Sequence, residues 1–285
     1  MSFSPRCLSF AIAGLLIASP VWAATLIEMN NVGGPQGQLH KQQMLIDDQH
    51  ARMEGSQANQ YLLISFGENK SYMVNTAQKQ VLEMPNPSSQ PSPPPAFLKQ
   101  LQDQQAKLPE VKAELVKKGP GPDIVGLPTM QYQVMANGEL CSDEYVSEKA
   151  LENQHLKLFT QYMQNMKNAR KKAMGGLRMP SANACAQAAD NLADEVAKLG
   201  LSMRSVAKDG TVMQEVVALK TDVATKPDTF SVPKDYETMT AQQMMQKAME
   251  RMKQMKPPTP PTGAPQGAPA LQPAPAPQPA PAPQQ

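Results

Sequence analysis

Methionine is the residue type that this sequence concentrates, and its thioether can either bind a soft metal ion or fill an apolar site. One face of a predicted C-terminal helix carries a stripe of five methionines, Met244, Met245, Met249, Met252 and Met255, and the first four are candidate ligand-binding residues. Thioether sulfur suits Cu(I), which makes Met244, Met249 and Met252 candidate metal ligands. The same flexible side chains suit an adaptable surface for an apolar ligand, so the stripe alone leaves both possibilities open.

Motifs for catalysis are missing from the sequence. The three histidines, His40, His50 and His155, are scattered, and His155 falls on the apolar face of a predicted helix, where we expect it to pack. There is no nucleophile elbow, H-E-x-x-H, phosphate loop or C-x-x-C motif. We therefore predict that the protein is not an enzyme and that it requires no cofactor.

The overall composition excludes two classes of protein. The 285 residues include 27 Lys and Arg against 25 Asp and Glu, and a formal net charge of +2 gives no bias towards nucleic acid. A mean hydropathy of −0.44 and an aromatic content of 5% argue against a polytopic membrane protein. No apolar run after the N-terminal segment is long enough to span a bilayer, so we predict that this is not an integral membrane protein.

The N-terminal residues 1–23 are typical of a secretory signal peptide. Arg6 supplies the positive charge, Leu8–Ala18 forms a short apolar stretch, and cleavage is expected after Ala23. No cysteine follows the apolar stretch where a lipoprotein would require one. The expected location is the periplasm, with the mature protein free of a lipid anchor.

Two cysteines remain after removal of the signal peptide, Cys141 and Cys185. An oxidising compartment favours a disulfide between them. Two buried free thiols are the alternative, because pairing depends on a Cα separation that the sequence does not provide.

Short apolar segments separated by polar turns predict an antiparallel sheet over residues 24–84. A proline-rich loop follows at 85–95, and two polar helices are expected at Ala96–Lys107 and Glu110–Lys118. The sheet resumes with an alternating strand at 130–134, the turn Asn137-Gly138 and the return strand Glu139–Val146.

A helical insert is predicted at 147–200, with Ser147 and Ser181 as the N-caps of its two helices. A hairpin covers 201–219, and residues 237–256 form the methionine-rich amphipathic helix, with Thr240 and Gln243 as its capping box. The rest, 257–285, is rich in proline and alanine and is predicted to be a disordered tail.

The order of these elements resembles that of an uncharacterised family of exported bacterial domains related to the lipoprotein-carrier (LolA-like) half-barrels. The stretches that carry the resemblance are Arg52-Met53-Glu54 with Tyr61–Phe66, Ser71–Asn75 and Gln80–Met84, then Ile124–Gly138 with Tyr145–Ser147, and finally Pro227–Tyr236. The resemblance covers residues 24–236 in outline. It implies an α+β fold in which a curved antiparallel sheet, a half-barrel, carries helical insertions over its concave face.

The resemblance also implies a hydrophobic cavity, which in characterised relatives holds acyl chains. We therefore expect an apolar ligand, such as a lipoprotein acyl chain, to contact the methionine stripe together with Leu63, Tyr132 and Val134. The methionine helix would then be a mobile lid, although it could equally be a fixed part of the core. Cu(I) handling through that helix and binding of an envelope protein through helix and tail are the alternative functions.

Overall fold

The computed structural model describes residues 23–33, 37–55, 57–84, 93–177 and 183–254. Most of the predicted signal peptide, most of the proline-rich loop, Ser181 and the predicted tail therefore lie outside the described residues. The contacts divide the chain into two units, Met1–Met244 and Met245–Gln285.

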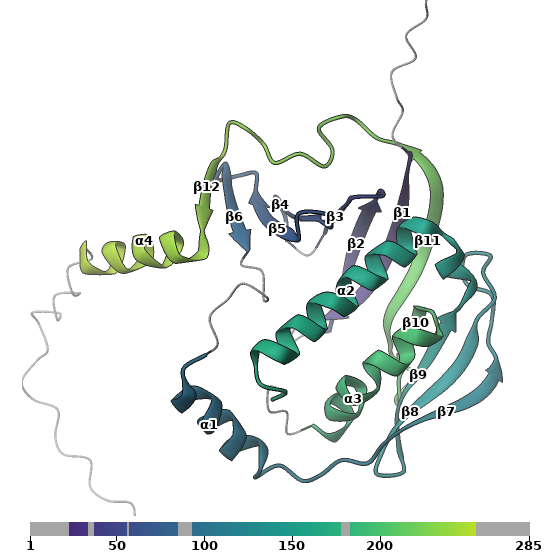
Figure 1. Ribbon diagram of the computed structural model, residues 1–285. Coiled ribbons are helices and arrows are strands. Elements are labelled where there is room, and N and C mark those ends of the chain that lie inside the picture. The colour runs from purple at the N-terminus through teal and green to yellow at the C-terminus, as the bar shows by residue number, and fades with distance from the viewer. Residues whose placement is uncertain (1–22, 34–36, 56, 85–92, 178–182, 255–285) are drawn as a thin grey trace, which may run out of the picture. The chain divides into compact units, whose positions relative to one another are not determined.

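The first unit has an α+β fold built on one open sheet, which confirms the predicted fold class (Figure 1). Its strands are β1 (Ala23–Gly33), β2 (Gln38–Ile46), β3 (His50–Glu54), β4 (Gln60–Ser65), β5 (Lys70–Asn75), β6 (Gln80–Met84), β7 (Ala113–Pro120), β8 (Met130–Ala136), β9 (Glu139–Ser147), β10 (Leu201–Ala207), β11 (Val212–Ala224) and β12 (Glu237–Thr240). The helices within the described residues are α1 (Pro95–Gln105), the short 3₁₀ helix η1 (Lys149–Glu152), α2 (Gln154–Ala173), α3 (Ala184–Leu199) and α4 (Ala241–Gln254).

The twelve strands follow the order β12-β6-β5-β4-β3-β2-β1-β11-β10-β9-β8-β7. Neighbouring strands are antiparallel except β12, which pairs in parallel with β6. Hairpins join β1 through β6 and β7 through β9, while the long strand β11 pairs with β1 and so links the two halves. This topology matches the alternation of apolar and polar residues expected of an antiparallel sheet.

Helices α2 and α3 both cover the same face of this sheet, and we call it the helix face. Helix α2 packs mainly on β1 and β2, where Leu156 and Tyr162 join a core that includes Ile27 and Met44. Helix α3 packs on β7 to β10, and its Leu192 contacts the core around Val134. Figure 1 shows the sheet curving around this helix pair.

The opposite face of β3 to β6 is covered by residues 225–236, which we call the return segment. It leads from β11 to the far edge strand β12, and its Phe230, Val232 and Tyr236 pack on a cluster that contains Tyr61 and Leu63. The Arg52 guanidinium donates a hydrogen bond to the Thr229 carbonyl oxygen at 3.0 Å. Both faces of this part of the sheet are thus used.

Three local predictions differ from the structure. The segment 110–118, predicted as a helix, contributes instead to strand β7, where Leu115 pairs with Val134 of β8. Its Ala, Glu, Leu and Lys residues are good helix formers, but helix propensities differ by less than about 1 kcal/mol per residue and are readily overridden by tertiary pairing. Residues 237–240, predicted as helix, form β12 instead, which pairs in parallel with β6 at the edge of the sheet.

The N-cap of the helical insert is the third difference. Ser147 ends β9 and pairs with Leu201, so it cannot begin a helix. The chain stays extended there because Gly200 approaches so closely that an added Cβ would lie 2.4 Å from the Ser147 carbonyl oxygen. The N-cap of α2 is Asn153 and that of α3 is Asn183.

Candidate functional site

A row of apolar side chains crosses the helix face of the sheet, perpendicular to the strands. The register places one residue of each strand from β12 to β1 side by side, and the members are Met239, Leu82, Met73, Leu62, Met53, Met44 and Ile27. Directly paired residues on one face of a sheet bring their side chains within contact distance. We call this set the methionine row.

The middle of the methionine row is less covered than its ends. Met239, Met44 and Ile27 are buried. Leu62, Met73 and Leu82, on β4 to β6, are only half-buried, and the chief contacts of α2 and α3 lie on other strands. A half-buried apolar row with flexible methionines is a surface on which a long apolar ligand can lie.

The sequence analysis did not predict this row, although the alternation of side chains along each strand indicates which residues share a face. Residues two apart in a strand share a face, so Leu62 lies on the face opposite Leu63. The identity of its cross-strand neighbours depends on register, which the sequence does not state.

The predicted ligand-binding residues of the sheet fall on both of its faces. Val134 is buried on the helix face beneath α3, and Tyr132 lies two residues before it on the same face. Leu63 lies on the other face, 2% exposed, in the cluster covered by the return segment. The structure therefore brings Tyr132 and Val134 together and keeps Leu63 apart from them.

The predicted methionine stripe lies on helix α4. The predicted capping box is present, since the Thr240 amide donates to Gln243 Oε1 at 2.8 Å and the Gln243 amide donates to Thr240 Oγ1 at 3.3 Å. Met244 and Met249 are 47% and 55% exposed. The side chains of Met245 and Met252 lie outside the described set, so the role of the stripe stays a prediction.

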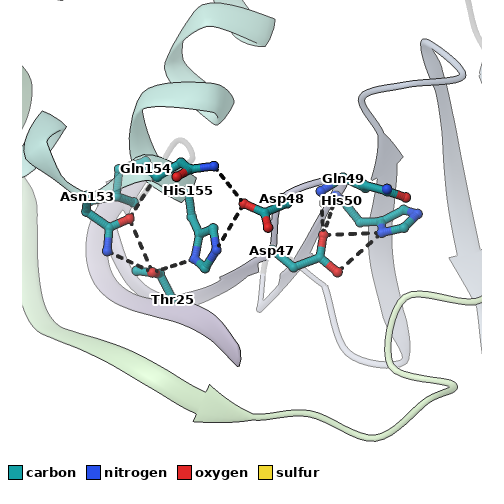
Figure 2. Close-up of polar contacts among 9 residues, drawn as sticks. Thr25, Asp47, Asp48, Gln49, His50, Asn153, Gln154 and His155 are labelled. Atoms are coloured by element: carbon teal, nitrogen blue, oxygen red, sulfur yellow. Dashed lines mark hydrogen bonds and ion pairs between the residues drawn. The ribbon is translucent and has the colours of Figure 1, made fainter. Parts of the chain in front are cut away.

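A chain of polar contacts beside α2 has the appearance of a catalytic triad (Figure 2). His155 Nδ1 lies 3.0 Å from Thr25 Oγ1, and its Nε2 lies 3.5 Å from Asp48 Oδ1. Thr25, however, is only 1% exposed, and Asn153 Nδ2 donates a second hydrogen bond to its hydroxyl at 3.0 Å. These contacts fix the start of α2 against β1 and the β2–β3 turn, and the buried hydroxyl has no access to a substrate.

The same turn is held from the other side by His50. Its Nδ1 lies 3.2 Å from Asp47 Oδ1, and its ring stacks on Phe230 of the return segment with 5.6 Å between ring centroids. Asp47 also accepts hydrogen bonds from the backbone amides of Gln49 and His50 (Figure 2). The two His–Asp pairs thus anchor one tight turn to elements on both faces of the sheet.

Burial shifts the pKa values of two tyrosines. Desolvation raises the pKa of Tyr61 above 10.0, although the Arg52 guanidinium, 3.8 Å above its ring, acts in the opposite direction. Desolvation also raises the pKa of Tyr162, whose side chain packs beneath α2. Both phenols are therefore held in the neutral, hydrogen-bonding form, which suits structural residues.

Neither a metal cluster nor a membrane helix is found in the part of the chain that the structure describes. No three His, Cys, Asp or Glu side chains in those ranges are grouped closely enough to hold a metal ion. Among the described helices, none is long and apolar enough to cross a membrane.

The structure pairs the two remaining cysteines. A disulfide joins Cys141 of β9 to Cys185 of α3, with a Cα separation of 5.3 Å. It lies beside Val134 and Ala188 and fixes the start of α3 to the sheet. Helix α3 is thereby tied covalently to the strands that it covers.

Comparison with known proteins gives a likeness of fold only. No family model matches the chain, and no curated protein matches it. The complex of MucA and MucB from Pseudomonas aeruginosa matches at 10% identity and a TM-score of 0.36, over 77% of this chain and 59% of that one. A structure of MucB alone matches at 9% identity and a TM-score of 0.32, over 76% and 59%. A structure of PNGF-II matches at 11% and 0.35, over 80% and 33%.

This chain therefore spans about 59% of the length of the MucB chain that it matches. Similarity at this level carries no function from one protein to another.

Proposed function

We propose that this protein binds an elongated apolar ligand, such as an acyl chain, on the helix face of its sheet, and that it acts in the periplasm as a non-enzymatic binding protein. The observation that carries the proposal is the half-buried middle of the methionine row, Leu62, Met73 and Leu82. The disulfide between Cys141 and Cys185 supports the location, since such bonds persist in oxidising compartments.

The physical driving force is burial of apolar surface. Each methylene that leaves water contributes about 0.8 kcal/mol, so affinity should rise about fourfold for every added CH₂ until the row is filled. Methionine side chains adjust their shape at little cost, which favours chains over rigid ligands. A ligand running along the row crosses the strands at right angles and contacts one residue of each.

The test uses native mass spectrometry of protein purified from the periplasm, followed by displacement of a fluorescent fatty acid. Met73→Lys places an ammonium group in the middle of the row and should weaken binding at least tenfold. Leu39→Lys is the matched control, because Leu39 is 60% exposed on the opposite face. The milder variant Met73→Gln, with a measured unfolding midpoint, guards against misfolding.

Two results would overturn the proposal. One is protein that carries no ligand from the periplasm and takes up no fatty acid. The other is equal binding by the wild type, Met73→Lys and Met73→Gln.

Cu(I) handling is the second candidate, favoured by the exposure of Met244 and Met249 on α4. Thioether side chains in an exported protein are suitable Cu(I) ligands. Calorimetry with Cu(I) should then show binding that is lost when Met244, Met249 and Met252 are replaced together by Leu, which keeps the helix apolar. Unchanged calorimetric traces would remove this candidate and leave the acyl-chain proposal untouched.

A further inference from the structure

A cavity of about 320 Å³ lies beneath α3, between that helix, the middle of α2 and strands β8 to β10. Its walls are almost wholly aliphatic, being formed chiefly by Val134, Ala189, Leu192, Ala193, Val196 and Leu201. A volume of this size lies at the lower end of the range for small-molecule sites. The cavity is distinct from the methionine row, whose half-buried members lie on β3 to β6.

One charged side chain, that of Glu144, lines this apolar cavity. Three serine hydroxyls donate hydrogen bonds to its carboxylate: Ser142 Oγ to Oε1 at 3.1 Å, Ser205 Oγ to Oε1 at 2.6 Å, and Ser202 Oγ to Oε2 at 3.0 Å. Ser142 lies on β9, two residues before Glu144, and Ser202 and Ser205 lie on the neighbouring strand β10. Such a cage fixes the orientation of the carboxylate towards the cavity side of the sheet.

The negative charge of Glu144 has no compensating cation. Within the described ranges, no Lys, Arg or His forms an ion pair with it, and its partners are neutral hydroxyls. An uncompensated charge at an apolar site is costly unless a partner of opposite charge arrives. The site is therefore complementary to a ligand that has both a cationic end and an apolar body.

The walls of the cavity are held in place before any ligand arrives. The disulfide ties α3 to β9, and the close approach of Gly200 to the Ser147 carbonyl oxygen fixes the path from α3 into β10. A preorganised site loses less entropy on binding than one that must form around its ligand.

From these observations we infer a second binding site, beneath α3, for a small amphiphilic amine. The ammonium group pairs with the Glu144 carboxylate, and the alkyl or aryl body fills the aliphatic space under α3. A fatty acid is disfavoured there, because its carboxylate would meet that of Glu144. The inference does not depend on the proposed acyl-chain site.

The test measures binding of octylammonium, octanol and octanoate to the mature protein by calorimetry and by amide chemical-shift changes. Octylammonium should bind most tightly, with shifts on α3, β9 and β10. Glu144→Gln keeps the shape of the side chain, removes its charge and replaces one accepting oxygen by a donating amide group; it should weaken octylammonium binding about tenfold or more, while octanol binding stays the same.

Asp143→Asn is the matched control, because Asp143 is the neighbouring carboxylate on β9 and accepts its hydrogen bond from Gln131 instead. This variant should bind octylammonium as the wild type does. Shifts confined to α3, β9 and β10 separate this site from the methionine row, which lies on β12, on β6 to β2 and on β1.

Three results would overturn the inference: no octylammonium-induced shifts on α3, β9 and β10 of the wild type, equal shifts there in wild type and Glu144→Gln, or octanoate-induced shifts on these elements that match those of octylammonium.

Discussion

Asn153 is a single side chain that joins two parts of the chain 128 residues apart. Its Oδ1 accepts the Leu156 amide at 3.1 Å and caps α2, while its Nδ2 donates to the buried hydroxyl of Thr25 in β1. Capping and the anchoring of the helix to the sheet therefore depend on one amide group.

Asn153→Ala should lower the free energy of unfolding by about 2 kcal/mol, the upper end of the range for loss of an N-cap, because the Thr25 hydroxyl also loses a donor. Urea unfolding followed by circular dichroism measures the change. Gln154→Ala is the control, since Gln154 contacts only the exposed side of the turn through Asp48, and it should change stability by less than about 0.5 kcal/mol. Equal effects of the two variants would contradict the assignment.

The two buried tyrosines predict how stability depends on alkaline pH. Their folded-state pKa values lie above the ordinary tyrosine value of 10.0, because burial disfavours the phenolate. The folded state thus holds these protons more tightly than the unfolded state does. Their contribution is fully present below about pH 10 and is lost as the pH rises through the folded-state pKa values.

Ultraviolet absorbance of the phenolate checks this during an alkaline titration. The wild type should show a late phase that is reduced in Tyr61→Phe and in Tyr162→Phe. A late phase that persists in the Tyr61→Phe, Tyr162→Phe double variant would refute the prediction.

At the scale of elements, the disulfide determines how firmly α3 stays on the sheet. It closes a loop with a sequence separation of 44 residues, and the loss of that constraint should cost about 4 kcal/mol by the chain-entropy relation. Reduction should therefore lower the urea midpoint of the wild type markedly.

The double variant Cys141→Ser, Cys185→Ser serves as the control for this experiment. It should start from the lower midpoint and show no response to the reductant. Free thiols in the unreduced, denatured wild type would show that the two cysteines do not pair in the cell.

For the whole molecule, the division of the chain at Met244 predicts that the first unit folds by itself. A chain ending at Met244 retains all twelve strands, α2 and α3, and it should unfold at the same urea midpoint as the full mature protein. Its fatty-acid affinity should match that of the full mature protein, because all members of the methionine row lie within the first unit.

The midpoint and the affinity are read separately in that comparison. A large fall in the midpoint would contradict the independence of the first unit. An unchanged affinity would remove Met245, Met249 and Met252 from the candidate ligand site.

The sequence by itself was sufficient for features that depend on near neighbours. Alternating residues predicted most of the strands, Asn137-Gly138 predicted the turn between β8 and β9, and Thr240 with Gln243 predicted the start of α4. These signals are local, because side-chain periodicity and capping involve residues at most a few positions apart. Where local preference and tertiary pairing disagreed, as at residues 110–118, the helix prediction was wrong and pairing with β8 decided the outcome.

Only the tertiary structure decided the candidate sites. Met53, Leu62, Met73, Leu82 and Met239 form a row because the register of separate strand pairs aligns them, and a shift of one residue in any strand would turn its side chain to the other face. The three serines reach Glu144 from two strands, and the cysteines meet because α3 packs on β8 and β9. These contacts are non-local, and residue types and spacing do not encode them by themselves.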